Sequence, residues 1–520
     1  MAGVERPAVS NWERRHPDYP APAVRQAGAE PERFRADEVL AWLSVRTVPA
    51  NARRPGEPAG TTYGDRFRTG LAGGSAGGLL AAVRGLTGSA MERVRGPVPL
   101  KVYLEWLLYF VYCAIVEADG GAAGRRDFDR FAHECAVPEE KYPRSLPDGF
   151  QELIDHSPPG SPEEARQAFD LVLGLLRDAD AREGGDFLTP PSVSRTMAGA
   201  LAAVQPVASM PHDPYCRTGE LLTAYLDAAA AQGSETRGAS GRVLHERDLR
   251  NVNMNLCVHG AEPELVELAE GPFTPATGPV DPPGSFDTVI TNPPFGGRLP
   301  DDVPPPSYWK YGRARRTEFD WLQYAASRLT PRGRAAVLMP AGAAFNAGAA
   351  RAVRTGLVEN GAVECVMELP AQLFERTAIR THIWFLRAPD VPGASAGNVL
   401  FVAGAGLGQS VTRTRRALRD DDIARLVREY SSWCAAAAGR DHAGTPGLSK
   451  VATPAEIAAH DNSLEPVLYV RPTGTAPFPV TDPAEVRHRL GELAGELDHL
   501  HAWAESVQAE VNRQLGRYDL

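Results

Sequence analysis

The chain has 520 residues and a mass of 55.9 kDa, which is too long for one ordinary domain and excludes a small fold held together by disulfides. Hydrophobic residues make up 43% and charged residues 23%, as in folded globular proteins and unlike disordered or membrane chains. The net charge of −10 excludes a chain coated with basic residues, so nucleic-acid binding would need a local basic surface.

The cysteines and the first residues indicate a reducing cytoplasm. The six cysteines are far apart in the sequence and form no CxxC pair, so neither a disulfide framework nor a metal site is predicted. The first twenty residues lack the apolar run of a secretory leader, and the most apolar stretch, 102–116, is short and interrupted by Glu105. We therefore expect a cytoplasmic protein that does not associate with a membrane.

Helical patterns dominate the first third of the chain. Residues 1–30 are rich in Pro, Ala and Arg without periodicity and are interpreted as a flexible tail. Residues 31–180 are predicted to form a mainly helical domain. Apolar residues recur there at helical spacing in 34–45, 79–86, 100–118 and 162–179, the last after Ser161 as the expected N-cap.

From about residue 184 the pattern changes, because short apolar runs alternate with helical segments. The strand-like runs are 242–244, 288–291, 335–339, 362–368 and 382–386. Such alternation predicts an α/β domain over 181–475, with a Rossmann-like, mostly parallel sheet and helices on both faces.

The C-terminus has the clearest periodicity in the chain, and it predicts one long helix over 482–515. Apolar residues recur at alternating spacings of four and three along a seam formed by Val486, Leu490, Leu493, Leu497, Leu500, Ala504, Val507 and Val511. A helix folded back onto its own domain would account for one apolar face. The length and regularity of the seam favour a coiled-coil-type helix that pairs with a partner chain.

The run FDTVITNPPFGG, residues 286–297, places a polar amide and a rigid backbone after a sheet strand, where ligands of open α/β sheets bind. This suits methyl transfer to an aryl amine, whose lone pair is delocalised into the ring. The Asn292 side-chain oxygen and the Pro293 carbonyl each accept one amine hydrogen, which frees the lone pair. Pro293 and Pro294 fix the backbone, and Phe295 stacks on the base. The alternative is an ordinary turn at a strand end.

With its neighbours, this motif resembles the modification subunits of type I restriction-modification systems, the N6-adenine DNA methylase family, from about residue 184 to 471. The resemblance implies a segment that closes over a methyl donor, S-adenosylmethionine, at GGDFLTPPSV, residues 184–193. Its candidate contacts are Phe187, Leu188, Thr189 and Pro190. A helix start with Thr189 as N-cap is the plainer interpretation, and both can hold together.

The run DPYCRTGELL, residues 213–222, resembles the family's donor-binding loop, in which backbone N–H groups approach the amino-acid part of the donor. Asp213, Cys216, Thr218 and Gly219 agree with the family pattern. Arg217 and Glu220 replace glycines. If the first of these glycines has a positive φ in relatives, an arginine there is strained and donor binding is impaired.

An acid after a strand and a group of arginines complete the candidate site. Glu246 follows the strand-like run at 242–244, a position from which an acid binds ribose hydroxyls in related nucleotide-binding folds, and its alternative is a solvated helix cap. Arg313, Arg315 and Arg316 follow the 286–297 run and are candidate contacts to DNA phosphates, or exposed loop residues without such a role.

The leading hypothesis is a subunit that transfers a methyl group to adenine N6 of a flipped-out base in double-stranded DNA. No long target-reading insertion is evident, so we expect sequence recognition from a separate specificity subunit docked on helix 482–515. No P-loop is present, so restriction would need another subunit. Two alternatives remain open: a catalytically impaired DNA-binding or scaffold protein, and an enzyme that methylates a protein glutamine.

Overall fold

A computed structural model shows the architecture of most of the chain between residues 36 and 471. The described residues are 12–22, 36–49, 52–53, 60–64, 78–88, 91, 98–120, 150, 154, 157–182, 188–205, 209–268, 281–298, 309–374, 379–389, 391, 397–412, 415–435, 442–471, 491–492, 494–495, 498–503 and 506–507. Most of the expected tail and most of the expected C-terminal helix lie outside them. Among the described residues, no helix combines the length and apolarity needed to span a bilayer.

The helices before the sheet agree with the sequence patterns. They are α2 (Ala36–Ser44), α4 (Leu79–Thr87), α6 (Leu100–Ala118) and α9 (Pro162–Arg182). Helix α9 begins as predicted, because the Ser161 hydroxyl accepts a 3.1 Å hydrogen bond from the backbone N–H of Glu164. Within the expected tail, Trp12 and Tyr19 contact the Trp42 ring on α2, with ring centroids 5.6 and 5.0 Å away.

The second part of the chain forms a nine-stranded sheet in the described residues. Its strands are β1 (Pro211–Asp213), β2 (Gly238–Val243), β3 (Glu262–Glu267), β4 (Phe286–Thr291), β5 (Leu329–Pro340), β6 (Val363–Glu368), β7 (Thr381–Arg387), β8 (Val399–Ala403) and β11 (Ser449–Ala452). Their order is β11-β8-β6-β7-β5-β4-β1-β2-β3. Strand β7 is antiparallel to β5 and β6, and β11 is antiparallel to β8, whereas the other neighbours are parallel. The prediction of a mostly parallel sheet is confirmed.

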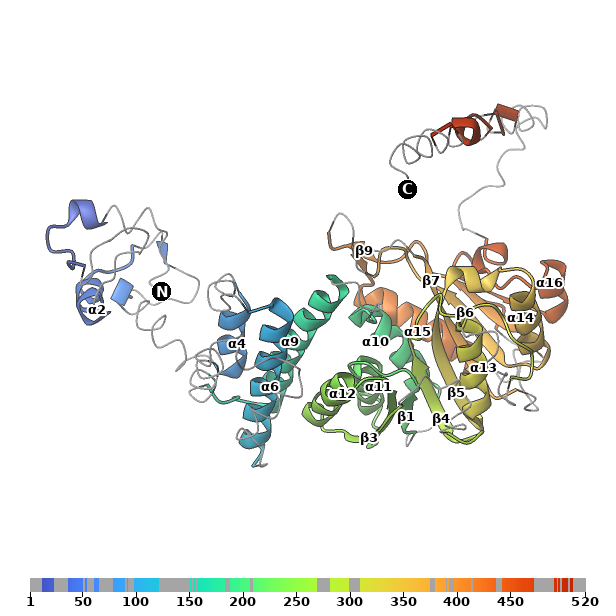
Figure 1. Cartoon of the computed structure of the whole chain (residues 1–520), viewed down its shortest axis with the longest axis horizontal. Helices are drawn as coiled ribbons and strands as arrows, with labels where there is room; N and C mark the ends of the chain where they lie inside the picture. Colours follow the sequence, from blue (N-terminus) through green and yellow to red (C-terminus); the bar gives the residue numbers. More distant parts are fainter. Residues whose placement is uncertain are drawn as a thin grey trace, which may run out of the picture.

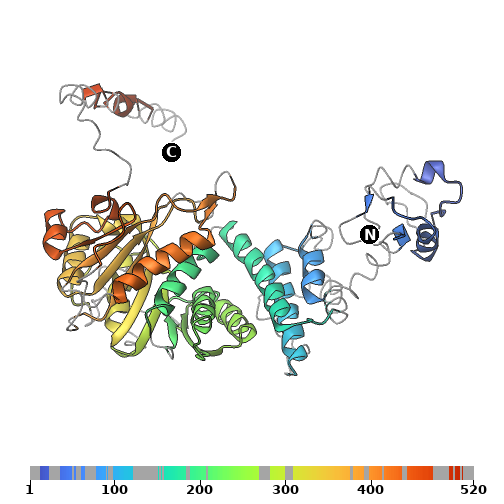
Figure 2. The same cartoon turned by 180° about the vertical axis from the view of Figure 1, so that it is seen from behind.

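Helices cover both faces of this sheet (Figures 1 and 2). One core packs α10 (Pro191–Ala202), α11 (Glu220–Ala230) and α15 (Asp420–Ala435) on the sheet. The other packs α13 (Glu318–Arg328), α14 (Ala349–Glu359) and α16 (Pro454–Ala459), with the 3₁₀ turns η5 (Ala341–Ala344) and η7 (Pro466–Leu468) nearby. A third core joins α4, α6 and α9 to Met254 and Val258 of α12 (Glu246–Val258), so the helical region packs on the α/β part. A short hairpin of β9 (Gln409–Ser410) and β10 (Arg416–Ala417) precedes α15.

The sheet order reverses between β1 and β4. From β1 the chain proceeds to β2 and β3 on one side, then crosses to β4 on the other side of β1. The register pairs His212 with Val289, so Asp213 at the end of β1 and Asn292 after β4 lie at the same edge. Such a switch point, at the carboxyl ends of parallel strands, is where open α/β sheets bind ligands.

Strands β1 and β3 and the start of β5 could not be predicted from apolar patterns in the sequence. Strand β1 has only three residues, and three of the six residues of β3 are glutamates, Glu262, Glu264 and Glu267. Because β3 is an edge strand with exposed side chains, its pairing with β2 stabilises it without an apolar pattern. Strand β5 begins at Leu329, earlier than predicted, and a shift in register against β4 accommodates its Pro-Arg-Gly sequence.

A buried ionic network lies between β2 and α13. The Asp281 carboxylate accepts hydrogen bonds from the Arg242 guanidinium and, at 2.6 Å, from the Tyr324 hydroxyl. Burial opposes ionisation of Asp281, yet the hydrogen bonds from Arg242 and Tyr324 hold the pKa of its carboxyl below the ordinary value. The neighbouring His212 ring stacks on Phe286 with centroids 3.7 Å apart, and burial lowers the His212 pKa to about 3. Arg242 is therefore the cation that neutralises Asp281.

Replacing Asp281 by alanine leaves the buried Arg242 guanidinium without its carboxylate, so we expect Asp281→Ala to lower the free energy of unfolding by about 3–5 kcal/mol. Urea unfolding followed by circular dichroism measures the change. The matched control is Glu264→Ala on the exposed face of β3, with an expected change below about 0.5 kcal/mol. Equal unfolding midpoints for Asp281→Ala and the unaltered chain would contradict this role.

Candidate active site

Asn292 is held by a residue more than a hundred positions earlier in the chain. Its side-chain nitrogen donates a 3.1 Å hydrogen bond to the hydroxyl oxygen of Thr189, and both side chains are buried. The bond fixes the orientation of the amide, with the nitrogen committed to Thr189 and the oxygen as the atom able to accept a hydrogen. The structure thus brings together two motifs that the sequence could place only separately.

The residues after Asn292 form a tight, well-supported turn. Pro293 is buried, and Pro294 and Phe295 are half-buried, with Phe295 packed against the core under α10 and α11. Gly296 has a φ of 77°, and its backbone N–H donates a 2.9 Å hydrogen bond to the buried Glu318 carboxylate at the start of α13. The turn is therefore anchored at both ends, by Thr189 and by Glu318.

The loop between β1 and α11 is shaped by Gly219. This residue has a φ of 75°, and a Cβ built on it would lie 3.3 Å from the Val252 side chain and 3.5 Å from that of Asn255. Asn255 itself donates a 2.7 Å hydrogen bond to the backbone carbonyl of Thr218. Backbone conformation and packing against α12 both require glycine at position 219.

Arg217 is not the strained residue that the sequence suggested. Among the described residues, positive φ angles outside glycine occur only at Gln372, Asp461 and Asn462, so the arginine has an ordinary backbone. Its guanidinium carbon lies 5.6 Å from the centre of the Tyr215 ring. The expectation of strain at Arg217 is therefore wrong, because the left-handed position of the loop is Gly219.

Glu220, the other departure from glycine, connects three segments. Its carboxylate accepts a 2.7 Å hydrogen bond from the Thr218 hydroxyl and a 3.3 Å one from the backbone N–H of Thr189, and it lies 3.8 Å from the Arg177 guanidinium of α9. Burial opposes ionisation, but the charges of Arg177 and Arg217 hold the pKa of Glu220 below its ordinary value. As the first residue of α11, the carboxylate also interacts favourably with the helix dipole.

Asp213 is a buried carboxyl with a perturbed pKa. Burial raises the pKa to about 7, the negative charge of Glu220 acts in the same direction, and the backbone N–H of Tyr215 opposes the shift with a 3.0 Å hydrogen bond. An acid that titrates near neutrality at a sheet switch point is typical of a functional site.

The other residues predicted to contact S-adenosylmethionine differ in how far they are buried. Leu188 and Pro190 are half-buried beside Thr189, Cys216 is buried within the loop, and Phe187 lies outside the described residues. Glu246 is the first residue of α12, three positions beyond the end of β2, and its side chain is exposed, 3.6 Å from Arg250. It lies at the carboxyl edge of the sheet, and its role in ribose binding stays a prediction.

A cavity of about 310 Å³ adjoins this site. It lies between α9 and the segment containing Thr189, and Arg177, Phe374 and Arg415 are also among its lining residues. Asn292 does not line the cavity, but its hydrogen-bond partner Thr189 does. The volume falls at the lower end of the range for small-molecule sites and is sufficient for a purine-sized ring.

The predicted DNA contacts lie beside the 292–297 turn. The backbone N–H of Thr317 donates a 3.0 Å hydrogen bond to the carbonyl of Gly297, which places the arginine segment against the turn. Arg315 and Arg316 are exposed, whereas Arg313 is half-buried with its guanidinium carbon 6.0 Å from the centre of the Trp309 ring. Their position is suited to contacts with a ligand approaching Asn292.

Sequence reasoning missed three residues that organise the site: Arg177, Asn255 and Glu318. Arg177 comes from a helix assigned to another domain, and no local pattern indicates that it reaches Glu220. No local pattern predicts the hydrogen bond from Asn255 to the Thr218 carbonyl, because it depends on how α12 packs. Glu318 has the pattern of an ordinary helix-start acid, and only the tertiary structure directs it to Gly296.

The sheet order and the site at the carboxyl ends of β1 and β4 define the fold of the S-adenosylmethionine-dependent methyltransferases. Within that class, the chain belongs to the N-6 DNA methylase family, whose model matches residues 165–476. The resemblance to type I modification subunits is confirmed.

Known proteins similar to this chain include methylase subunits of type I restriction enzymes. The HindI type I restriction enzyme methylase subunit of Haemophilus influenzae is 25% identical over 368 residues, covering 69% of this chain and 79% of the relative. The EcoEI methylase subunit of Escherichia coli is 27% identical over 236 residues, 43% of this chain and about half of the relative (47%). Among solved structures, a type I methyltransferase subunit from Streptococcus thermophilus matches 76% of this chain and 97% of its own, with 18% identity and a TM-score of 0.49.

The raised pKa of Asp213 predicts a pH-dependent cost to stability. The folded protein retains the proton to about pH 7, whereas an unfolded aspartate loses it near pH 4, so wild-type stability decreases between these values. Asp213→Asn removes this titration and preserves an acceptor for Tyr215. We expect the melting temperature of the variant to exceed that of the wild type by an amount that grows from pH 4 to pH 7 and is constant above pH 7.

The matched control is Asp119→Asn, which changes an exposed aspartate at the end of α6. Its difference from wild type should vary little over the same pH range. A pH-independent difference for Asp213→Asn would show that the carboxyl is ionised throughout.

Proposed function

We propose that this chain is the modification subunit of a restriction-modification or related defence system. It would transfer a methyl group from S-adenosylmethionine to adenine N6 of a base rotated out of double-stranded DNA. The observation that carries the proposal is the hydrogen bond from the Asn292 side-chain nitrogen to Thr189, because it makes the amide oxygen the atom that would accept a hydrogen of the target amine. Membership of the N-6 DNA methylase family supports the choice of adenine N6.

The chemistry requires two acceptors at one nitrogen. An aromatic amine is a weak nucleophile because its lone pair is delocalised into the ring. The Asn292 oxygen and the Pro293 carbonyl would each accept one of its hydrogens and draw the nitrogen towards tetrahedral geometry. The anchored 292–297 turn holds both acceptors in place, since their rearrangement would break the bonds to Thr189 and Glu318. Phe295 is half-buried and would contact the base through its exposed part.

The donor loop fits S-adenosylmethionine, which supplies an electrophilic methyl group when bound. The positive φ of Gly219 sets the backbone at the start of α11, whose N–H groups would approach the amino-acid part of the donor, and Asp213 lies at the adjacent strand end. Arg217 has an unstrained backbone, so strain at this position does not support a catalytically impaired scaffold.

Double-stranded DNA would contact the arginines beside the turn, and a specificity subunit would dock on the C-terminal seam. Two seam residues, Leu500 and Val507, are described and have 57% and 42% of their surface exposed. Exposed apolar residues at heptad positions favour pairing with another chain over folding back. A separate restriction subunit would supply any cleavage, and a cytoplasmic location accords with these partners.

Replacing Asn292 by alanine removes one acceptor of the amine hydrogens. We expect Asn292→Ala to reduce methyl transfer to unmodified DNA by about 100-fold or more, with donor binding within a few-fold of wild type. Incorporation of labelled methyl groups by the complete complex measures transfer, and calorimetry with S-adenosylmethionine measures donor binding. Transfer at the wild-type rate by Asn292→Ala would refute the proposed role.

Thr189 tests the orientation of that amide separately. We expect Thr189→Val, which removes the hydroxyl at nearly constant volume, to reduce methyl transfer by about 10-fold. The matched Thr189→Ser variant keeps the hydroxyl and should retain most of the activity. Equal losses in the two variants would indicate a packing role for Thr189 in place of an orienting one.

The partner requirement gives a further test on the full chain. We expect the chain alone to methylate DNA poorly and to gain activity when the specificity subunit is added. The double variant Leu500→Gln/Val507→Gln should fail to co-purify with that subunit, whereas the control His499→Gln/His501→Gln, at exposed positions off the seam, should co-purify normally. Robust site-specific methylation by the isolated chain would refute the requirement.

A further inference from the structure

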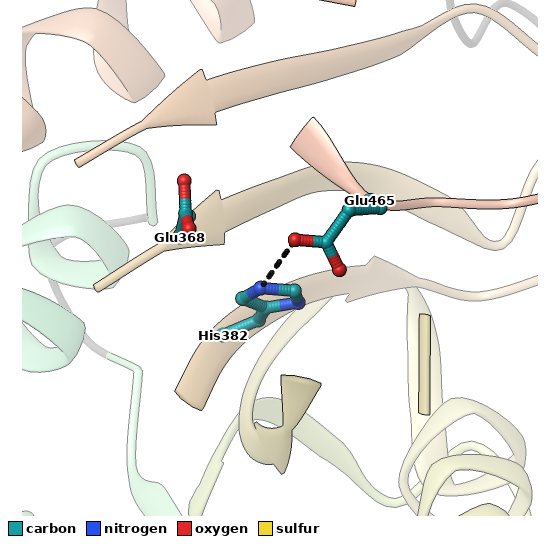
Figure 3. A group of neighbouring side chains, drawn as sticks. All are labelled: Glu368, His382 and Glu465. Carbon is teal, nitrogen blue, oxygen red and sulfur yellow. Dashed lines mark ion pairs between the residues drawn. The ribbon is translucent and has the colours of Figure 1, made fainter. Parts of the chain in front are cut away.

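Three ionisable side chains that the proposed methyl transfer does not use meet at the same edge of the sheet. Glu368 ends β6, His382 is near the start of β7, and Glu465 lies just before η7 (Figure 3). One ligand atom from each, a histidine nitrogen or a carboxylate oxygen, lies within 4.8 Å of the other two. No local motif connects them, since residues 368, 382 and 465 come from separate segments.

All three side chains are removed from solvent. His382 has 0% of its surface exposed, Glu368 3% and Glu465 7%. Neither ring nitrogen of His382 and neither carboxylate oxygen of Glu465 has a hydrogen-bond partner. The His382 Nε2 atom lies 3.9 Å from a Glu465 oxygen, which is too far for a hydrogen bond. Buried polar atoms without partners are costly, so this arrangement requires a physical explanation.

Pairing with Arg380 does not account for the cluster. The Arg380 guanidinium lies 3.6 Å from Glu368 and 3.9 Å from Glu465, but its side chain is half exposed and it offers nothing to the histidine. Burial raises the pKa of both Glu368 and Glu465, with Arg380 opposing, and burial lowers the His382 pKa to about 3. His382 is therefore a neutral imidazole at physiological pH, the form in which histidine binds metals.

We propose that Glu368, His382 and Glu465 form a binding site for a divalent transition-metal cation of the Zn²⁺ type, which fastens the closing segment 463–470 to the sheet. One imidazole and two carboxylates are a ligand set that suits Zn²⁺, whereas Mn²⁺ binds such sites more weakly and Mg²⁺ disfavours imidazole. Tetrahedral ligands at about 2.0–2.2 Å from one ion are about 3.3–3.6 Å apart. The three ligand atoms lie within 4.8 Å of one another, so they would have to move together by about 1 Å around the ion.

The segment that carries Glu465 is already held in place. The backbone N–H of Leu464 donates a 2.8 Å hydrogen bond to the carbonyl of Ala344, and the Tyr469 ring stacks on Phe401 of β8 with centroids 3.9 Å apart. Glu465 is thus positioned before any ion binds, as are the two strand residues. Such preorganisation reduces the entropic cost of binding, and the ion would connect β6, β7 and the closing segment.

The site lies near the candidate active site but is separate from it. His382 pairs with Met339 of β5, and β5 also pairs with β4, whose Thr291 precedes Asn292. Two strand spacings of about 4.8 Å place His382 about 10 Å from Asn292 across the sheet, and Glu368 on β6 lies one strand further. The ion is therefore expected to stabilise the edge that carries the active site without contacting the target amine.

The test uses the full chain without an affinity tag, stripped with EDTA and freed of chelator. Titration calorimetry with Zn²⁺, Mn²⁺ and Mg²⁺ should show one site that prefers Zn²⁺ to Mg²⁺, and one equivalent of Zn²⁺ should raise the melting temperature by about 3 °C or more. Glu465→Gln and His382→Gln should each abolish this site. The control is His460→Gln, an exposed histidine in the same region, which should leave the site unchanged.

Folding of the variants does not obscure the result. Glu465→Gln removes a like charge beside Glu368, so the metal-free variant should melt at or above the wild-type temperature. If His382→Gln fails to fold, Glu465→Gln alone decides. Absence of the site in the wild type, or equal Zn²⁺ binding by the wild type and Glu465→Gln, would overturn the proposal.

Discussion

The candidate site depends on Thr189, because this residue forms hydrogen bonds both to the Asn292 turn and to the start of α11. Its hydroxyl accepts from the Asn292 side chain, and its backbone N–H donates to Glu220 at the start of α11. The expected acceptor of the target amine and the expected donor loop are thereby held in one network. Arg177 extends that network into the helical region, so the position of α9 is coupled to the geometry at Asn292.

The two departures from the family's glycine-rich loop are best understood as a pair. Glu220 brings a buried negative charge to the site, and the positive charges of Arg177 and Arg217 keep it ionised. The same negative charge contributes to the raised pKa of Asp213. At positions 217 and 220 the loop thus carries two charged side chains that interact with each other, where the family pattern has glycines. Gly219 keeps the positive φ that favours glycine.

The carboxyl edge of the sheet carries two chemically different groups of residues. One lies at β1 and β4, where a polar amide and a buried acid meet a glycine turn. The other lies at β6 and β7, where an unpartnered histidine meets two buried carboxyl groups. In both groups a strand ends with a polar residue, Asp213 in β1 and Glu368 in β6, at an edge that other segments cover. Because the covering segments exclude water, such a residue has a shifted pKa or needs a buried partner.

Apolar periodicity, helix caps and short motifs are properties of neighbouring residues, so the sequence alone predicts the α/β class, the helices before the sheet and the 292–295 motif. It could not determine β1 or β3, which are stabilised by pairing with other strands, nor the normal backbone of Arg217. Three contacts of the two sites depend on tertiary packing: those of Thr189 with Asn292, of Arg177 with Glu220 and of His382 with Glu465. These contacts join residues 43 to 103 positions apart in the sequence, and such contacts are fixed by how the sheet and its helices pack.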